Sequence, residues 1–475
     1  MSYIEGESRS QSLLFPEILD DYITQDNLVR FIDAFVDGLK LEEMDFSRSV
    51  PEGTGRPPYD PRDLLKLYVY GYLNGVRSSR RLERECGRNV EVMWLVRKLR
   101  PDFKTIADFR KDNRKVFKGV FRQFTLLCKE MGLLGGELVA IDGSKFKAVN
   151  SSDRNFSERK LQKKIKEIEE KIEKYLADLD WGDEQEAEAK EAGVEGLKEK
   201  IEKLKERRGR YDELLKELER SGESQISLTD PDSRAMPLTP RGDVSYNVQV
   251  AVDSRHHLMV EQEVTNAVID SSQLFFMASK AQEILGKEEL SVVADMGYYH
   301  GDEIKACEEA GMTVYIQKAN TSANTALGLF GKERFVYDPQ EDCYRCPAGE
   351  KLTYHFDSEE LGRKIRYYWT TACNTCPIKA QCTRNKGFRR ITRWVDEDIL
   401  ERMEKRVRAN WELMKQRKQI VEHPFGTIKF WNDQRHFLMR GLEKVRAEFS
   451  LSALAYNIKR AINLVGVPKL VAAMA

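Results

Sequence analysis

The stretch LVAIDGSKFKAVN, residues 138–150, gives the first indication of the fold of this chain. Apolar residues from Leu138 to Ile141 precede Asp142, and a glycine, a serine and two lysines follow. A short apolar run is typical of a strand at the centre of a sheet that is covered on both faces. Asp is depleted from strands and common in turns, so the pattern predicts a strand that ends at Asp142. Alone, this Asp–Gly pair is weak evidence for a functional carboxylate.

A second apolar run ends on an acid in the same way. In LSVVADMG, residues 290–297, Asp295 follows Ala294. Ligands of α/β proteins lie at the ends of strands, and two carboxylates brought together there repel each other. Mg²⁺ relieves such repulsion because it takes oxygen ligands. We therefore expect Asp142 and Asp295 to bind a divalent metal together.

A third acid would complete a two-metal site, and RKQIVEHPFGTIKFW, residues 417–431, holds the best candidate. Glu422 stands there in an otherwise basic and apolar stretch with helical character. Lys429, seven residues later, shares its face if the helix continues, although Pro424 and Gly426 favour a kink or a restart. The alternative interpretation of Glu422 is an exposed helix carboxylate.

Between these acids the hydrophobic pattern alternates between strands and helices. SYNVQVAVD (245–253) and HLMVEQEVTN (257–266) read as strands, and MTVYIQK (312–318) is a further short strand. Residues 271–286 and 301–311 have helical spacing. The predicted order is strand–strand–strand–helix–strand–helix–strand, which indicates an α/β fold with a mixed five-stranded sheet.

The length of 475 residues is enough for about three domains. Residues 1–132 are predicted to form a helical domain, and residues 133–475 an α/β domain interrupted by insertions at 156–222 and 335–395. The chain contains no apolar stretch of about 18 residues, and its N-terminus lacks a basic region followed by an apolar run. We therefore expect neither a membrane span nor a signal peptide, and a cytoplasmic protein.

The insertion at 156–222 is rich in Glu and Lys and has a heptad-like pattern. Apolar residues recur at steps of three and four over 161–179 and again over 197–218. Two such helices in series suggest an antiparallel helical hairpin, or coiled coil, with the bend within 180–196. The pattern favours a solvated coiled coil without chemistry of its own.

Basic residues are unevenly distributed although the formal net charge is zero. From Arg77 to Arg122 there are 15 Lys/Arg and 6 Asp/Glu, and from Arg402 to Arg460 there are 14 and 6. Local basic surface is what meets DNA phosphate, so the helical domain at 1–132 is expected to bind DNA; a solvated helical face is the alternative. The residues expected to contact DNA are Arg77, Arg80, Arg81, Arg84, Lys145, Lys147, Arg417 and Lys418.

Five of the eight cysteines cluster in the second insertion. In a cytoplasmic chain such clustering points to metal rather than to disulfides. Two C-x-x-C pairs suit a structural, tetrahedral Zn²⁺, and a reduced, metal-free cluster is the alternative. The fifth cysteine leaves the ligand set open, because Cys382 can replace Cys373 or Cys376. The candidate zinc ligands are Cys343, Cys346, Cys373, Cys376 and Cys382.

Taken together, these motifs resemble the DDE transposases of bacterial insertion sequences, in the RNase H-like superfamily that includes retroviral integrases. The resemblance spans nearly the whole chain. It rests on motifs that occur in the family's order: PDFKTIADFRK (101–111), VAIDGSKFKAVNS (139–151), GDVSYNVQVAVD (242–253), VVADMGYYHGDEIKACEEAGMTVYI (292–316) and VEHPFGTIK (421–429).

The resemblance implies a catalytic triad of Asp142, Asp295 and Glu422 with two Mg²⁺ or Mn²⁺ ions, which cleaves DNA and joins it to a target. It also implies double-stranded DNA as partner, both transposon ends with terminal inverted repeats and target. A homodimer in the synaptic complex and association with the nucleoid follow from the same resemblance. Tyr298, Tyr299 and His300, just past the second acid, are candidates for stacking on an unpaired base.

One departure from the family concerns the signature around the last acid. Many members carry Tyr–Arg–Glu–Lys, with the Arg four residues before the Glu. Here Lys418 and Lys415 occupy the Arg and Tyr positions, Arg417 is adjacent, and Lys429 matches the final Lys as a candidate catalytic residue. Two alternatives remain, a domesticated DNA-binding protein and a metal-dependent nuclease of the same fold; an intact triad argues against the first.

Overall fold

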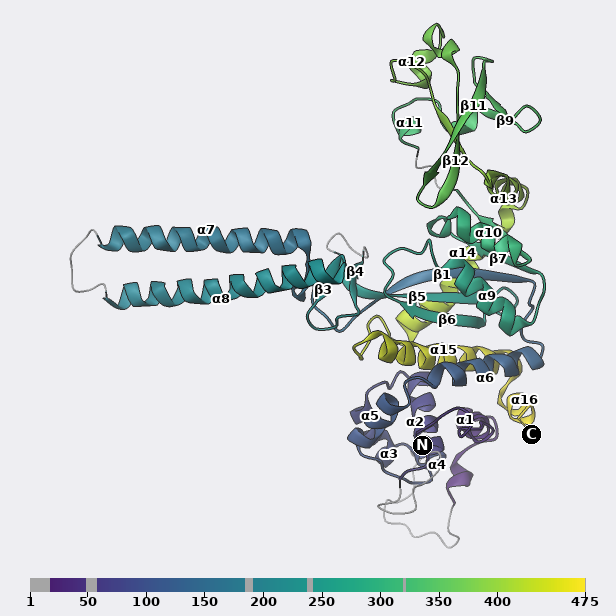
Figure 1. Cartoon of the computed structure of the whole chain (residues 1–475). Coiled ribbons are helices and arrows are strands. Elements are labelled where there is room, and N and C mark those ends of the chain that lie inside the picture. The colour runs from purple at the N-terminus through teal and green to yellow at the C-terminus, as the bar shows by residue number, and fades with distance from the viewer. Residues whose placement is uncertain (1–17, 48–57, 184–190, 237–241, 319–321, 475) are drawn as a thin grey trace, which may run out of the picture.

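A computed structural model describes residues 18–47, 58–183, 191–236, 242–318 and 322–474 (Figure 1). These residues form a mixed α/β structure around one six-stranded sheet. The strands of this sheet are β1 (Leu138–Lys147), β4 (Arg234–Met236), β5 (Asp243–Asp253), β6 (Met259–Thr265), β7 (Leu290–Ala294) and β8 (Met312–Ile316). Within the described residues, no helix is long and apolar enough to cross a membrane.

Strand β1 lies at the centre of the sheet. It pairs antiparallel with β5 on one side and parallel with β7 on the other, and β8 follows β7 in parallel. The other edge of β5 pairs antiparallel with β6 and, at its beginning, with β4. The chain order β1, β5, β6, α9 (Leu274–Leu285), β7, α10 (Gly301–Glu309), β8 confirms the order expected from the sequence. The short β4 was not foreseen and makes the sheet six-stranded.

The prediction that the first strand ends at Asp142 is wrong. Strand β1 continues to Lys147, and Asp142 lies at its middle, paired with Val250 of β5. Gly143 also stays in the strand, opposite Gln249. Position 143 has no room for a side chain, because a Cβ there would lie 2.5 Å from Nε2 of Gln249. The Asp–Gly pair is therefore a close approach within a sheet and not a turn.

The two faces of β1 meet different helices. Phe146 packs against Phe425 of α14 (Trp411–Gly426) and Phe449 of α15 (Leu442–Val465). Gly143, whose Cβ position points to the opposite face, lies beside the loop that leads into α9. Side chains at even positions of β1 thus face α14, and those at odd positions face the α9 side, as strand alternation requires.

The N-terminal helices pack on the C-terminal helix α15. Helices α2 and α6 contact α15 directly, and α1 contacts α16. Asp60 caps α2, with Pro61 at its first turn, as the sequence predicts. Residues 103–130 form two helices with a break at 113–116. These helices are α1 (Leu28–Asp37), α2 (Pro61–Leu73), α3 (Ser79–Arg88), α4 (Val90–Leu95), α5 (Phe103–Asp112), α6 (Phe117–Glu130) and α16 (Val467–Ala472), preceded by the 3₁₀ turn η1 (Leu19–Tyr22).

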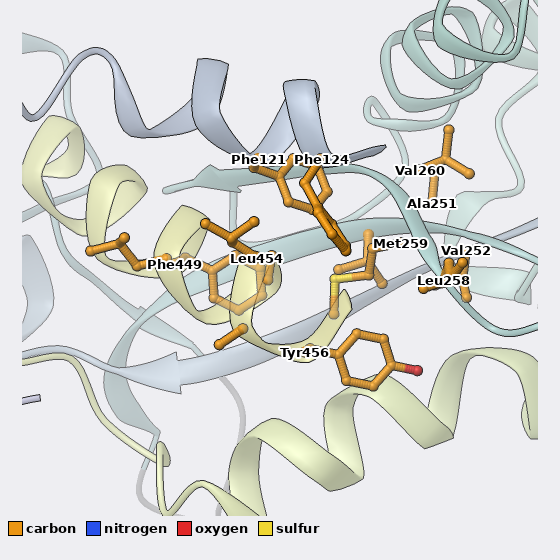
Figure 2. Close-up of a cluster of buried hydrophobic side chains, with 14 of the residues drawn as sticks. Phe121, Phe124, Ala251, Val252, Leu258, Met259, Val260, Phe449, Leu454 and Tyr456 are labelled. Carbon is orange, nitrogen blue, oxygen red and sulfur yellow. The ribbon is translucent and has the colours of Figure 1, made fainter. Parts of the chain in front are cut away.

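The N-terminal helices and the sheet share one hydrophobic core. Figure 2 shows Phe121 and Phe124 of α6 beside Met259 of β6 and Leu454 of α15. All four side chains are buried. Because burial of apolar area is the main stabilising term in folding, this shared core ties the N-terminal helices to the α/β part of the chain.

The helical hairpin expected over 156–222 is present as α7 (Glu158–Asp183) and α8 (Glu191–Ser221), which project from the sheet in Figure 1. The expected bend falls partly on 184–190, outside the described residues. Leu161 and Ile168 of α7 pack with Tyr211 and Leu214 of α8 in a separate apolar cluster. A two-stranded ribbon, β2 (Asn155–Ser157) and β3 (Gln225–Ser227), closes the base of the hairpin.

The cysteine-rich insertion forms a second sheet, of five antiparallel strands. Its core contains Tyr344, Leu352 and Tyr368. Helix α13 (Glu397–Ala409) leads from this insert to α14. The elements of the insert are β9 (Val336–Asp338), β10 (Cys343–Arg345), β11 (Lys351–Glu360), β12 (Arg363–Trp369), β13 (Ile391–Trp394), α11 (Ala323–Ala326) and α12 (Lys379–Cys382).

Candidate active site

Asp142 lies in β1, and Asp295 directly follows β7, the neighbouring parallel strand at the centre of the sheet. The last paired residues of β1 and β7 are Ile141 and Ala294, so the two acids occupy the next positions in register. Neighbouring strands lie about 4.8 Å apart, which places the two carboxylates within reach of one ion. Oδ1 of Asp295 accepts a hydrogen bond from the amide of Gly297 at 2.8 Å, which fixes one of its oxygens.

The carboxylate of Asp142 is half-buried and its ionisation is unfavourable. Burial raises the pKa of Asp142 to about 6, and the negative charge of Asp295 acts in the same direction. Nη1 of Arg417 lies 3.3 Å from Oδ2 of Asp142, and its positive charge partly opposes these effects. Two acids held close together, although burial and mutual repulsion disfavour their ionisation, are typical of a cation site.

Helix α14, which carries Glu422, packs across β1, β5 and β7. Glu422 itself is exposed, and no hydrogen bond or ion pair of the described residues joins it to Asp142 or Asp295. Helix α14 therefore lies on the face of the sheet toward which Asp142 points, but Glu422 contacts neither aspartate. Of the basic residues expected on this helix, Arg417 faces Asp142 while Lys418 is exposed.

Lys429 lies beside Asp142 because the backbone after Gly426 widens. Residues Thr427–Trp431 form a π-helical turn, the kink that Pro424 and Gly426 predict. Nζ of Lys429 donates to Oγ of Ser144 at 2.6 Å and to the carbonyl of Lys145 at 2.9 Å. Burial lowers the pKa of Lys429 to about 8, which the charge of Asp142 partly opposes.

Sequence reasoning missed a polar network on the opposite face of β1. Asp270 accepts hydrogen bonds from Asn247 at 2.6 Å and Gln249 at 2.7 Å, and it pairs with Lys145 at 3.1 Å. The hydroxyl of Tyr298 donates to Oε1 of Gln249. The signal in the sequence was the pair of amides in YNVQV, which are fully buried. This network lies directly behind Asp142 and fixes the strand that carries it.

Two of the lysines and one arginine expected to meet DNA are engaged within the protein. Lys145 forms the ion pair with Asp270, and Lys147 forms one with Asp243 at 2.9 Å. Arg77 is buried; it pairs with Glu448 at 3.3 Å and donates to the carbonyl of Asp433. The expectation that Arg77 contacts DNA is therefore wrong, because it holds the N-terminal helices against α15.

Ion pairs within the protein also account for much of the excess of basic residues between Arg77 and Arg122. Arg97, Arg114, Lys118 and Arg122 each pair with an acid, three of them with acids of the α/β part. Exposed arginines remain on α3. Arg88 pairs with Glu85, whereas Arg80, Arg81 and Arg84 form no ion pair with the described residues.

The tyrosines expected to stack on an unpaired base are not freely exposed. Tyr298 is fully buried and Tyr299 is half-buried against Glu404, so the stacking role assigned to Tyr298 is wrong. The exposed aromatic side chains beside Lys429 are Phe430, 67% exposed, and Trp431, 84% exposed. Trp431 also borders a pocket between the π-helical turn and α15 that contains Lys459 and Arg460.

Four of the five clustered cysteines line one pocket of the insert. These are Cys346, Cys373, Cys376 and Cys382. Cys343 is excluded from the pocket, because it is buried on the other side of β10, where its thiol faces Glu341. The expected pair Cys343–Cys346 therefore does not share the pocket, because only Cys346 lines it. Cys382, the residue whose role was ambiguous, joins the group.

Two family models match parts of this chain. A family model described as a transposase domain matches residues 17–112, and one described as a transposase DDE domain matches residues 345–462. Both matches are to transposase models, and they confirm the resemblance to DDE transposases that the sequence motifs indicate. The second match includes Glu422 and Lys429 but neither β1 nor β7.

Among solved structures, the chain is similar to the piggyBac transposase in its synaptic complex with hairpin DNA, determined by cryo-EM. The identity is 9%, the TM-score is 0.27, and the match covers 92% of this chain and 82% of that chain. No curated protein sequence matches it significantly.

Proposed function

We propose that this chain is an active DNA transposase that binds the terminal inverted repeats of its insertion sequence, cleaves the DNA next to them and joins the ends to a target. The observation that carries this proposal is the register of β1 and β7, which sets Asp142 beside Asp295 under helix α14. The strand order β6-β5-β1-β7-β8, in which only β5 runs antiparallel to the other strands, supports an RNase H-like core.

The residues present fit a pair of divalent cations. Asp142 and Asp295 offer carboxylate oxygens, and the pKa of Asp142 is raised by burial and by its neighbour, a state that bound cations would relieve. In this proposal Glu422 of α14, the helix that packs across β1 and β7, supplies the third carboxylate. When bound, Mg²⁺ or Mn²⁺ would activate the attacking oxygen and stabilise the leaving oxygen at the scissile phosphate.

The other side chains have positioning roles in this proposal. Arg417 holds the Asp142 carboxylate, and Lys429 holds the backbone of β1 at Lys145 while keeping a positive charge close to the phosphate. Phe430 and Trp431, exposed beside Lys429, take over the stacking role on an unpaired base. Arg80, Arg81 and Arg84 of α3, with Lys418 of α14, provide exposed cations for DNA.

The experiment that tests this function uses full-length protein, a duplex that carries the element's own terminal repeat, and a plasmid target in Mg²⁺. A transposase should release the end and join it covalently to the plasmid, which a metal-dependent nuclease would not do. A domesticated DNA-binding protein would bind the repeat without cleaving it. Light scattering of the complex that holds two transposon ends measures its mass, which should correspond to two chains.

We also propose that the insert binds one structural Zn²⁺ through Cys346, Cys373, Cys376 and Cys382. Four thiolates suit tetrahedral zinc, and these four line a common pocket. Metal analysis of protein purified without added zinc should give about one Zn²⁺ per chain, reduced by Cys376→Ser or Cys382→Ser. Cys343→Ser is the matched control and should keep its zinc; loss of zinc from this variant alone would refute the ligand set.

A further inference from the structure

The second half of the insert has an unusual charge. From residue 361 to residue 393 there are nine Lys/Arg and no Asp/Glu, in a chain whose net charge is zero. Four of these cations pair with acids outside the segment: Arg363 with Asp302, Lys364 with Asp357, Arg366 with Asp342, and Arg393 with Glu401. Arg384, Lys386 and Arg390 are exposed, and none of them pairs with an acid of the described residues.

An aromatic stack holds one of these cations in place. The rings of Trp369 and Phe388 stack with centroids 5.3 Å apart, and His355 stacks on the Trp369 ring. The guanidinium of Arg390 lies 5.5 Å from the centroids of both Trp369 and Phe388. A guanidinium fixed in this way loses little side-chain entropy when it binds an anion. Arg384 and Lys386 lie in the same short loop, which begins after Cys382.

The insert is anchored beside the catalytic acids. Arg363, at the beginning of β12, donates to Oδ2 of Asp302 at 2.8 Å and lies 3.0 Å from Nε2 of His300, both in the segment that follows Asp295. Trp369 ends the same strand. At about 3.3 Å per residue, the six steps between them span about 20 Å. The stacked end of the insert is therefore about 20 Å along β12 from the segment next to Asp295.

We propose that this basic–aromatic face, defined by Arg384, Lys386, Arg390, Trp369 and Phe388, binds the phosphate backbone of duplex DNA. The inference rests on the proposed function for the identity of the polyanion, and it assigns a DNA contact to the insert in addition to its zinc. The three cations pair with no acid of the described residues, and Arg363 anchors their insert to the segment that follows Asp295. Their positive charge therefore complements the phosphates of DNA held in the active site. At about 3.4 Å per base pair, about 20 Å equals about six base pairs, so we expect the contact about six base pairs along the duplex from the DNA held at the catalytic segment.

The test measures the affinity of the full-length chain for a labelled 30-base-pair duplex at several salt concentrations. The variant Arg384→Ser/Lys386→Ser/Arg390→Ser should bind more weakly, and the slope of log affinity against log salt should fall by about 2 to 3, since each phosphate contact contributes about 0.9. The matched control is Arg345→Ser/Lys351→Ser/Lys364→Ser, which removes the same charge from exposed ion pairs of the same insert. Its slope should stay within about 0.5 of wild type.

A second variant protects the test against misfolding. Arg384→Ser/Lys386→Ser leaves the stack with Arg390 intact, and its slope should fall by about 2 with an unchanged melting temperature. With terminal-repeat DNA, hydroxyl-radical protection about six base pairs from the cleavage site should disappear in both variants. Equal slopes for the triple variant and its control, or unchanged protection, would overturn this inference alone.

Two further outcomes separate this inference from the proposed function. A wild-type chain that binds no DNA would overturn both. A preference for duplex RNA over duplex DNA that is lost in the triple variant would overturn the DNA assignment of this face, while cleavage of terminal-repeat DNA would still support the proposed function.

Discussion

Nη1 of Arg417 lies 3.3 Å from Oδ2 of Asp142, so the helix that carries Glu422 places a guanidinium against the first acid of the motif. The family signature suggested Lys418 for the basic position before this glutamate, but Lys418 is exposed and Arg417 faces the sheet. A cation supplied by the protein thus partly balances Asp142 and Asp295, whose mutual repulsion raises the pKa of Asp142 in addition to burial. Metal ions would compete with this arginine for the carboxylate.

Asp142→Asn should stabilise the metal-free protein at pH 7. The folded-state pKa of Asp142, about 6, lies above the usual value of 3.8 because of burial. The native state therefore binds more protons than the unfolded state between about pH 4 and pH 6, and stability falls as the pH rises through this window. The shift corresponds to about 3 kcal/mol at pH 7, so we expect a gain of about 1–3 kcal/mol in the free energy of unfolding.

Urea unfolding with EDTA at pH 7 and at pH 4 checks this prediction. The gain should be small at pH 4, where Asp142 is protonated in the native state, and Mg²⁺ should stabilise the wild type more than the variant. A metal-free variant that is less stable than wild type at pH 7 would show that Asp142 is stabilised by its surroundings, contrary to this account.

Gly143→Ala should destabilise the protein by about 1–3 kcal/mol, the usual cost of forcing extra atoms into a packed site. The new Cβ would meet Nε2 of Gln249 at 2.5 Å and Oδ1 of Asp270 at 2.8 Å, and the network behind Asp142 would have to move. Gly209→Ala, in helix α8 with open space around it, is the control and should be neutral or slightly stabilising. Equal melting temperatures for the two variants would contradict the close packing behind β1.

Arg77 and Arg81 should have separable effects. Arg77→Ala leaves Glu448 buried without its ion-pair partner, so it should cost about 3–5 kcal/mol of stability. Arg81→Ala, at an exposed position of α3, should leave stability within about 0.5 kcal/mol and weaken binding to terminal-repeat DNA. Thermal unfolding and DNA-binding titrations of both variants measure this. A stable Arg77→Ala variant would mean that the N-terminal helices are held by other contacts.

Trp431→Ala should slow cleavage of intact duplex ends, about 10-fold for a stacking contribution of 1–3 kcal/mol, with little change in folding. A substrate with an abasic site at the stacked position should restore the rate, because no base then has to be held out of the duplex. Trp411→Ala, an exposed tryptophan at the opposite end of α14 and the π-helical turn, is the matched control. If both variants cleave at the wild-type rate, Trp431 does not stack on DNA.

Much of the sheet was predictable from the sequence because strand and helix periods differ. The order of five strands and two helices, the cap at Asp60 and the hairpin at 158–221 all follow from local patterns. The end of β1 was not predictable from Asp142, since its place in the strand depends on pairing with Val250 and on Gly143 fitting against Gln249.

Side-chain partners across the fold were the least predictable part of the site. The charge count from Arg77 to Arg122 suggested DNA contact, but the acids that pair with Lys118 and Arg122 lie more than 100 residues away, on β6 and α9. Cys343 occurs in a regular C-x-x-C pair, yet strand alternation in β10 turns it away from Cys346's pocket. Which side chains meet depends on how distant elements align in the fold, and no local sequence pattern contains this information.

The most direct test of the central claim is Mg²⁺-dependent cleavage of terminal-repeat DNA by Asp295→Asn. This variant keeps the shape of the side chain and the hydrogen bond from Gly297, but it removes one negative ligand beside Asp142. Glu412→Gln, an exposed acid near the start of α14, is the control and should cleave normally. The account predicts that Asp295→Asn binds the repeat with unchanged affinity and cleaves at background level. Cleavage by Asp295→Asn at the wild-type rate would contradict it.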